Sequence, residues 1–320
     1  MDRPGALARL SAAVGMFADQ YLPHAPGWVV ALSGGPDSLA LAAVASRLRP
    51  TTALIVDHGL QAGSAQVAAI ARQQALALGC VDAQIIPVIV GVQGGPEAAA
   101  RAARYAALAQ TRGDNPVLLG HTLDDQAETV LLGLGRGSGP RSLAGMLPLD
   151  LPWCRPLLGV RRAATRQACT ELKLTPWLDP HNSDSRFTRA RLRTEVVPLL
   201  ETVLGGGVAE ALARTATSLR EITALIDDLA EQALAGCTVE ADLDVAALAD
   251  LAGPVRRAVI RRWVLAGGGR SVTDLHIRAV ERLITSWHGQ GGVAIGSRLR
   301  HQRLFVVRGG DRLRLRQQPI

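Results

Sequence analysis

The sequence predicts an α/β fold: a doubly wound, Rossmann-like parallel sheet followed by a smaller, mainly helical C-terminal region. Short apolar runs alternate with helical segments about every thirty residues in the first half of the chain, which is typical of βαβ units. A glycine-rich turn follows the first apolar run directly. Three consecutive glycines at 205–207 precede a long stretch of helical periodicity. We therefore expect domains at 1–204 and 208–320.

The first strand is predicted at 28–32, where five apolar residues lie between Pro26-Gly27 and a polar turn. The chain then breaks at Ser33-Gly34-Gly35, and Pro36 begins a helix at a position where its missing N–H costs nothing. The two glycines allow positive φ and let backbone N–H groups approach a ligand. Strand, turn and helix N-terminus together predict an anion site.

The residues of this turn narrow down the kind of anion site. A Walker A loop needs Gly-Lys-Ser/Thr, and the single lysine of the chain, Lys173, is far away in the sequence. Backbone amides and the Ser33 and Ser38 hydroxyls are therefore the expected phosphate donors. Asp37 would repel a bare phosphate, so we expect Mg²⁺ between them. Ser-Gly-Gly alone also fits an ordinary strand-to-helix turn, but Pro-Asp-Ser at the helix start favours the anion site.

Further strands are expected at 52–59, 83–88 and 116–120, with a short strand-like segment at 153–158. The helices expected between them lie at 6–21, 36–48, 64–78, 96–111, from 121 to 132, and 161–172. Ligands of such sheets bind at the carboxyl ends of the strands. Ser33, Asp57 and His121 all come at that edge, so we expect a single active cleft there.

The remainder of the chain is expected to be helical, at 208–234, 245–251, 254–265 and 273–287. A small β element is expected at 293–295 and 303–307, followed by a loose basic tail. The glycine-rich segment 133–141 is either a flexible linker or a loop that closes over substrate.

Composition limits the class of protein. The 320 residues carry a formal net charge of +7, which favours a polyanionic partner, nucleic acid rather than membrane, over a basic protein with no such partner. Four scattered cysteines without a CxxC pair argue against a disulfide framework, an iron–sulfur cluster or a structural zinc site. The first residues, Met1-Asp2-Arg3-Pro4, lack a secretory apolar region, and no apolar run is long enough to span a bilayer. A cytoplasmic protein is expected.

Three acids begin the helix after the fourth strand. Asp125 and Glu128 are three residues apart and share a helix face, which suits Mg²⁺ or the ammonium group of an amine substrate. The alternative is structural, because Thr122-x-x-Asp125 resembles a capping box and Asp124 complements the helix dipole. His121 contacts nucleotide or ends the strand.

Two groups of arginines are candidates for binding phosphate, one on a predicted helix and one in a loop-to-helix segment. Arg101 and Arg104 share a helix face beside Tyr105, and arginine holds phosphate or stabilises developing negative charge. The alternative is a solvated face with a Glu97–Arg101 pair. Four further arginines suit RNA phosphates or form a solvated basic face: Arg186, Arg189, Arg191 and Arg193.

Taken together, the motifs resemble the tRNA(Ile)-lysidine synthetase family of PP-loop ATP pyrophosphatases over roughly the first two hundred residues. They appear in order as SGGPDS (33–38), DHGL (57–60), ARAARY (100–105), GHTLDDQAET (120–129), RPLL (155–158) and DPHN (179–182). The resemblance implies a PP-loop domain and a helical tRNA-binding domain. It also implies a ligase that uses ATP, Mg²⁺ and free L-lysine to convert the wobble cytidine of the CAU anticodon of tRNA(Ile) to lysidine.

The resemblance assigns roles residue by residue. ATP is assigned to Ser33, Gly34, Gly35, Pro36, Asp37, Ser38, Asp57, His58 and His121. The reaction centre is assigned to Asp37, Arg101, Asp125 and Glu128, with Asp37 as the metal ligand. The tRNA is assigned to Arg136 and Arg141 in a closing loop and to Arg186, Arg189, Arg191 and Arg193. Ala190 stands where the family commonly has Asn, and the C-terminal part matches weakly. A homodimer is compatible with this assignment.

Two other functions remain open on the sequence. Another adenylating enzyme, such as a tRNA thiolase or an amidotransferase-like protein, would share the loop, although thiolation normally uses cysteines or a cluster. An RNA-binding protein that only senses ATP would bind nucleotide without releasing pyrophosphate.

Overall fold

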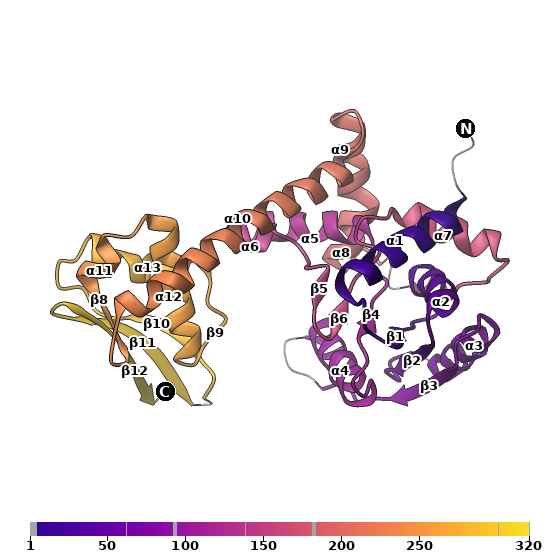
Figure 1. Cartoon of the computed structure of the whole chain (residues 1–320), viewed down its shortest axis with the longest axis horizontal. Helices are drawn as coiled ribbons and strands as arrows, with labels where there is room; N and C mark the ends of the chain where they lie inside the picture. The colour runs from indigo at the N-terminus through magenta and orange to yellow at the C-terminus, as the bar shows by residue number, and fades with distance from the viewer. Residues whose placement is uncertain are drawn as a thin grey trace. The chain divides into compact units, whose positions relative to one another are not determined.

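The computed structural model describes residues 5–61, 63–91, 95–137, 139–180, 184–299 and 301–319. The chain divides into two compact units (Figure 1). One comprises Met1–Leu131 and Met146–Ala213, and the other Leu132–Gly145 and Arg214–Ile320. Met1-Asp2-Arg3-Pro4, on which the expected lack of a secretory signal rests, lies outside the described residues. Taken singly, no described helix is long and apolar enough to cross a membrane. One pair of helical segments, Thr188–Val203 and Val208–Cys237, is long and apolar enough together, by length and composition alone, but the pair is bent by 96°.

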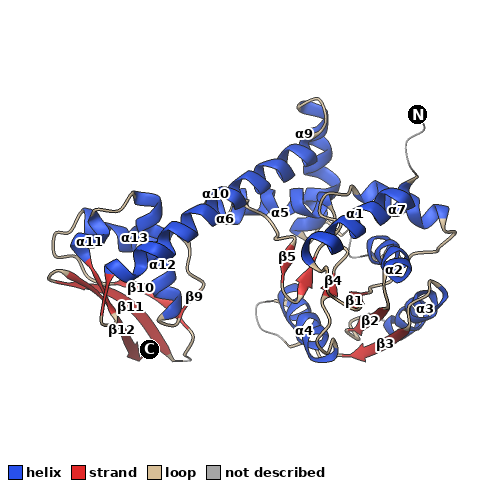
Figure 2. Cartoon of the chain, viewed as in Figure 1, coloured by secondary structure: helices blue, strands red, loops and turns tan. Residues whose placement is uncertain are grey.

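The first unit is built on a six-stranded sheet with the order β3-β2-β1-β4-β6-β5 (Figure 2). Its strands are β1 (Trp28–Ala31), β2 (Thr51–Asp57), β3 (Asp82–Pro87), β4 (Val117–Leu118), β5 (Leu149–Asp150) and β6 (Trp153–Cys154). All neighbours pair in parallel except β5 with β6. The doubly wound parallel sheet predicted from the sequence is therefore confirmed for this unit, with one antiparallel edge strand.

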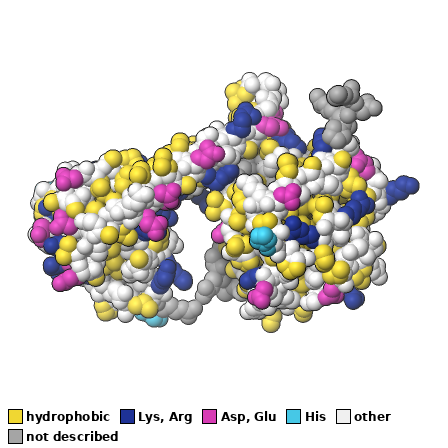
Figure 3. All heavy atoms as spheres, viewed as in Figure 1, with side chains coloured by type: hydrophobic (Ala, Val, Ile, Leu, Met, Phe, Trp, Pro, Cys, Tyr) yellow, Lys and Arg dark blue, Asp and Glu magenta, His cyan; other side chains and the backbone are white. Residues whose placement is uncertain are grey.

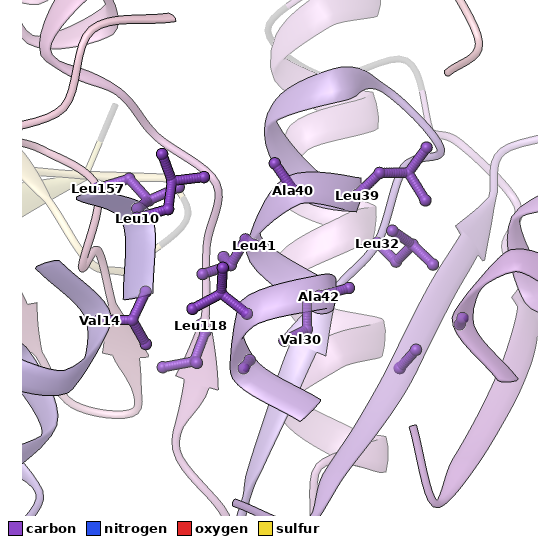
Figure 4. Packing of buried hydrophobic residues seen from close by; sticks show 14 of the residues in the cluster. Leu10, Val14, Val30, Leu32, Leu39, Ala40, Leu41, Ala42, Leu118 and Leu157 are labelled. Carbon is purple, nitrogen blue, oxygen red and sulfur yellow. The ribbon is translucent and has the colours of Figure 1, made fainter. Parts of the chain in front are cut away.

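Alternating side chains of β1 fill two cores. Val30 belongs to a cluster with Leu10 of α1 (Ala6–Tyr21) and Leu41 of α2 (Pro36–Leu48) on one face of the sheet (Figure 4). Val29 belongs to a second cluster with Leu108 of α4 (Pro96–Thr111). Because both faces are buried, the strand reads as an unbroken apolar run, and this made it recognisable in the sequence.

Six helices match the expected segments closely: α1 (Ala6–Tyr21), α2 (Pro36–Leu48), α3 (Ser64–Ala77), α4 (Pro96–Thr111), α5 (Leu123–Gly135) and α7 (Arg162–Glu171). Two further helices, α8 (Thr188–Arg191) and α9 (Val197–Val203), were not predicted from the sequence. A π-helical turn, η2 (Leu192–Val196), joins α8 to α9. α1, α2 and α7 pack on one another, which brings the N-terminus of α7 near that of α2.

The three glycines at 205–207 form an ordered turn before α10 (Val208–Cys237). All three have positive φ, between 73° and 91°. The Glu201 carboxylate accepts hydrogen bonds from the N–H groups of Val208 (3.0 Å) and Ala209 (3.2 Å), which caps the new helix. The first compact unit ends at Ala213, beyond this turn and within α10. The predicted domain boundary at 205–207 stays a prediction.

The second unit is built on an antiparallel sheet of six described strands, with the order β7-β8-β12-β11-β10-β9. The prediction of a mainly helical region with a loose basic tail is therefore wrong. β12 (Arg312–Pro319) pairs with β11 (Gln302–Gly309) over eight residues. The alternation Arg312-Leu313-Arg314-Leu315-Arg316 is the period-two pattern of a half-buried strand, and Leu313 is fully buried. The remaining elements are α6 (Pro140–Leu143), β7 (Thr238–Val239), β8 (Asp242–Asp244), α11 (Val245–Ala249), α12 (Gly253–Ala266), β9 (Gly269–Arg270), α13 (Asp274–Thr285) and β10 (Val293–Ser297).

The glycine-rich segment 133–141 is folded where it is described. A side chain at Gly133 would meet the carbonyl oxygen of Ser142 at 2.3 Å, so only glycine allows this approach. Arg141 Nη1 donates to Asp227 Oδ2 of α10 at 2.7 Å. The described part is therefore not a free linker, and its closing over substrate stays a prediction. Ser138 lies outside the described residues.

Candidate active site

The turn between β1 and α2 is fixed by hydrogen bonds to its backbone and between its hydroxyl groups. Gly34 has φ 79°, and its carbonyl accepts a hydrogen bond from Trp177 N at 2.9 Å. The Ser33 and Ser38 hydroxyl oxygens lie 3.1 Å apart. In the first turn of α2, the N–H groups of Asp37 and Ser38 have no partner within the helix. The predicted arrangement of strand, glycine turn and helix N-terminus is confirmed, and its phosphate-binding role stays a prediction.

Gly120, just beyond β4, leaves room for a close approach of the backbone. A side chain at Gly120 would meet the backbone of Asp37 and Ser38 at 3.1 Å. The segment leading from β4 into α5 therefore passes directly beside the N-terminus of α2. This contact brings the acids of α5 to the same sheet edge as the glycine turn.

The acids of α5 lie in a buried cluster with two arginines. Arg162 Nη2 lies 2.6 Å from Asp125 Oδ1, and its Nη1 lies 3.3 Å from Glu128 Oε1. Arg162 Nε lies 3.5 Å from Asp37 Oδ2, and Thr165 donates a hydrogen bond to the same carboxylate. The Glu128 side chain is only 2% exposed. Three acids from α2 and α5 thus converge on one guanidinium.

Arg193, in η2, is the second cation of this cluster. Its Nε lies 2.9 Å from Glu128 Oε1, and its Nη2 lies 3.4 Å from Asp125 Oδ1. The sequence had placed Arg193 among residues that contact RNA. The structure places its side chain, 25% exposed, on Asp125 and Glu128, the two carboxylates that the sequence assigns to the reaction centre.

Asp125 also caps its own helix. Its Oδ2 accepts from Thr122 N at 2.8 Å and from the Thr122 hydroxyl at 2.7 Å. The capping alternative raised by the sequence is therefore confirmed, and it coexists with the ion pairs. Burial alone would raise the pKa of Asp125, but Arg162 and the Thr122 hydrogen bonds hold that pKa below its ordinary value. For Asp37, burial outweighs Thr165 and Arg162 and raises the pKa.

A second group of side chains carries buried nitrogen atoms that have no hydrogen-bond partner among the described residues. These atoms are His58 Nδ1, Arg104 Nε and His121 Nδ1, from three different segments. Burial, with Arg104 nearby, lowers the pKa of His58. Burial lowers the pKa of His121 to about 3, and Arg155, Arg104 and Arg101 act in the same direction. Both imidazoles are therefore neutral at pH 7, beside a positively charged arginine.

Arg101 lies near His121 but makes different contacts from those expected. Its Nη2 donates to the Tyr105 hydroxyl at 3.1 Å, and its guanidinium carbon lies 4.8 Å from the centre of that ring. The ion pairs of Asp125 and Glu128 go to Arg162 and Arg193 instead. The assignment of Arg101 to the reaction centre stays a prediction. Asp57 lies at the end of β2 and accepts from Gly59 N at 3.0 Å.

The other arginines predicted to meet tRNA lie mostly on the surface. Arg186 pairs with Asp184 at 2.7 Å and Arg191 with Glu195 at 3.0 Å, whereas Arg189 is half-buried. Arg136 is exposed. In Figure 3 basic and acidic side chains are interspersed on the visible face rather than gathered by sign. The tRNA-binding roles stay predictions, and His181 and Asn182 of the DPHN motif lie outside the described residues.

Sequence reasoning missed Arg162 and Thr165. Both stand in the first turn of α7, where the sequence indicated only a basic helix beginning near Arg161. An arginine at a helix N-terminus opposes the helix dipole, so Arg162 needs a strong reason to be there. The three surrounding acids provide that reason. The place of Arg162 at a helix N-terminus was the signal in the sequence that could have revealed its role.

An open parallel sheet with a glycine turn at the helix N-terminus, lacking a Walker lysine, and with acids at the same edge defines the PP-loop class of ATP-binding α/β proteins. The family model described as PP-loop domain matches residues 10–200. A second model, described as TilS substrate binding domain, matches residues 243–313. The chain belongs to the tRNA(Ile)-lysidine synthase family of tRNA-modifying ligases.

Relatives of full length support this assignment. The chain is 67% identical to a tRNA(Ile)-lysidine synthase of Mycolicibacterium paratuberculosis over 320 residues, covering 100% of both chains. It is 65% identical to the Mycobacterium tuberculosis H37Rv protein of that name over 324 residues, again covering 100% of both. Among solved structures, the U34-tRNA thiolase NcsA from Methanococcus maripaludis matches with a TM-score of 0.54 and 19% identity, covering 68% of this chain and 80% of that one. This last likeness concerns the fold.

Proposed function

We propose that the chain joins L-lysine to the wobble cytidine of the CAU anticodon of tRNA(Ile). In the first step the C2 oxygen of cytidine attacks the α-phosphorus of ATP, and pyrophosphate leaves. In the second step the ε-nitrogen of lysine forms a bond to C2 and loses a proton, and AMP leaves with the oxygen. The products are lysidine, AMP and pyrophosphate.

The observation that carries this proposal is the position of Asp37. It is a residue of the glycine turn that would receive the triphosphate, and its carboxylate shares Arg162 with Asp125 and Glu128. A site for phosphates and a site for a cation therefore adjoin at one sheet edge. Joining an amine to an adenylated base requires this combination.

The residues present fit ATP on both sides of the turn. The open N–H groups of α2 and the Ser33 and Ser38 hydroxyls suit phosphate oxygens. His58, Arg104 and His121 present buried nitrogen atoms that have no protein partner among the described residues, and hydrogen bonds from nucleotide would satisfy them. We assign adenosine to the His58 and His121 side.

Asp37 fits Mg²⁺ as a single carboxylate ligand. Mg²⁺ is usually held by one or two carboxylates together with phosphate oxygens and water, so it needs no larger protein cage. Burial raises the pKa of Asp37, and a nearby divalent cation would favour the ionised form. When bound, the metal would neutralise charge on the phosphates.

The charge of the acid cluster suits the amine substrate. Asp37, Asp125 and Glu128 carry three negative charges when ionised, against two positive charges on Arg162 and Arg193. Because Mg²⁺ at Asp37 would bring the negatively charged phosphates with it, the cluster still favours one further cation, and a lysine ε-ammonium group has this charge. Asp125 and Glu128 would orient the amine before its proton is released.

Thiolation, the principal alternative on the sequence, is disfavoured by the cysteines. Cys80, Cys154, Cys169 and Cys237 are all buried and free. Burial raises the pKa of Cys80 to about 11, of Cys154 to about 12 and of Cys169 to about 11. A thiol that stays protonated is a poor nucleophile and a poor metal ligand.

The decisive experiment is mass spectrometry of tRNA nucleosides after incubation with ATP and isotope-labelled lysine. We expect one labelled lysidine at the wobble position of tRNA(Ile) and none in tRNA(Met), although both have a CAU anticodon. Pyrophosphate release without any labelled nucleoside would instead support another adenylating enzyme. Nucleotide binding without pyrophosphate release would support an ATP-sensing RNA-binding protein.

A further inference from the structure

Arg162 is the point at which three elements of the first unit meet. Its guanidinium uses Nε toward Asp37 of α2, at 3.5 Å, and its two terminal nitrogens toward Asp125 and Glu128 of α5, at 2.6 and 3.3 Å. The side chain is 10% exposed. A planar fork with donors on several sides can serve three carboxylates at once, which a lysine ammonium on a flexible stem cannot do with the same geometry.

The residue is fixed in place by its surroundings. The backbone N–H of Arg162 donates to Asp124 Oδ2 at 2.7 Å. The Thr165 hydroxyl, fully buried one turn later, contacts both the Arg162 carbonyl oxygen and the Asp37 carboxylate. The first turn of α7 is thereby tied to α2 and to α5 through separate contacts.

We propose that Arg162 is a positioning residue for both steps of the reaction, holding the phosphate-side acid Asp37 and the amine-side acids Asp125 and Glu128 in one array. It acts through these acids and touches no reacting atom. The inference rests on the proposed function, since it assumes that Asp37 serves adenylation and that Asp125 and Glu128 serve lysine transfer. It adds a requirement that the two steps share one guanidinium.

Arg161 provides a matched control. It is the adjacent residue, of the same type, and it also contacts three acids: Asp124, Glu201 and Glu210. Its side chain, however, is 38% exposed, and it touches neither Asp37, Asp125 nor Glu128 in the structure. Arg161→Gln therefore removes a comparable number of ion pairs without disturbing the proposed array.

The experiment measures the two steps separately in the full-length protein. Pyrophosphate release from ATP and tRNA without lysine reports adenylation, and lysidine formation against lysine concentration gives kcat and KM for transfer. We expect Arg162→Gln to slow both steps by about 10²-fold, since a misplacement of about 1 Å has effects of that size, and to raise KM for lysine. Arg162→Lys should recover part of the rate, and Arg161→Gln should stay within about twofold of wild type.

Thr165→Val tests one arm of the array. It removes the hydroxyl that contacts Asp37 and leaves the guanidinium in place, so we expect slower pyrophosphate release with an unchanged KM for lysine. The inference is overturned if folded Arg162→Gln, or Arg162→Lys where the Gln variant does not fold, performs both steps at the rate of Arg161→Gln. Failure of the wild-type protein to form lysidine would contradict the proposed function instead, whatever the variants do.

Discussion

Each unit contains a glutamate that is held by two arginines, and the two sites differ in the balance of charge. In the first unit Glu128 pairs with Arg162 and Arg193. In the second unit Glu281 of α13 pairs with Arg256 and Arg257 of α12, each at 3.1 Å. Both carboxylates are well shielded, with exposed fractions of 2% and 12%.

The surroundings of the two glutamates explain the difference. Around Glu281 two arginines serve one acid, and the contact joins two consecutive helices of one core. Around Glu128 two arginines serve three acids, drawn from α2 and α5. A structural ion pair needs no excess of buried negative charge, because desolvation makes that excess costly. Among the described residues, the excess at Glu128 supports the proposed site for a further cation, whereas the ion pairs of Glu281 join two packed helices.

Asp37→Ala should have the largest effect on activity. A small effect would contradict the comparison between the Glu128 and Glu281 sites. We expect pyrophosphate release to fall by at least about 10³-fold, since the substitution removes the proposed metal ligand beside the phosphates. Circular dichroism should show an unchanged fold. Asp242→Ala, which removes a half-buried partner of Arg314 in the second unit, is the control and should leave the rate unchanged. A fully active Asp37→Ala protein would remove the interpretation of the glycine turn as a phosphate site.

Glu128→Gln and Glu281→Gln compare the two sites directly. Glu128→Gln should slow lysine transfer by about 10²-fold, because the cluster loses the charge that attracts the amine. Glu281→Gln should leave both steps within about twofold and lower the free energy of unfolding by about 1–3 kcal/mol, since two half-buried arginines lose a charged acceptor. Single-turnover kinetics and urea unfolding measure the two effects. An equal loss of activity in both variants would contradict the distinction drawn here.

The sequence supported prediction of the first unit better than of the second, and the physical reason is local. β1 and β2 are continuous apolar runs because both sheet faces are covered, and Pro36 begins a helix immediately after a glycine turn. β12 alternates arginine with leucine, a pattern that also fits a charged tail. Its pairing with β11 depends on a register that no local signal specifies.

The candidate site shows the same limit of local sequence patterns, which do not specify tertiary contacts. Asp37 was predicted from its place in the glycine turn and Asp125 and Glu128 from their spacing on a helix face, and the structure brings the three together. Arg162 was missed because its role depends on α7 packing beside α2, a contact between segments more than a hundred residues apart. Arg193 was assigned to RNA from its place in a run of arginines, whereas the π-helical turn η2 directs it to Glu128. Local spacing predicts which residues share one face of a helix, and tertiary packing decides which of these faces meet.

His121 gives a prediction for pH dependence. Its pKa is about 3 in the folded protein against an ordinary 6.5, so the unfolded chain binds more protons between these values. The His121 contribution to stability is therefore complete above pH 6.5 and is lost as the pH falls toward 3. We expect the urea midpoint of wild type to fall more between pH 7 and about pH 5 than that of His121→Gln. An equal fall of the urea midpoint in both proteins would show that the His121 imidazole is not buried from water as the structure indicates.

The smallest expected effect distinguishes two arginines that are neighbours in the sequence. Arg191 is exposed and pairs with Glu195, whereas Arg193 reaches the buried acids. Arg191→Ala should weaken tRNA binding a few-fold and reduce the slope of log affinity against log salt by about 1, with lysine transfer at saturating tRNA unchanged. Arg193→Ala should do the reverse, slowing transfer with little change in the salt slope. Arg47→Ala, at the other end of α2, is the control for a general loss of charge. If Arg193→Ala changed the salt slope as Arg191→Ala does, then Arg193 would leave the acid cluster to meet the RNA, and the charge balance around Glu128 would differ in the complex.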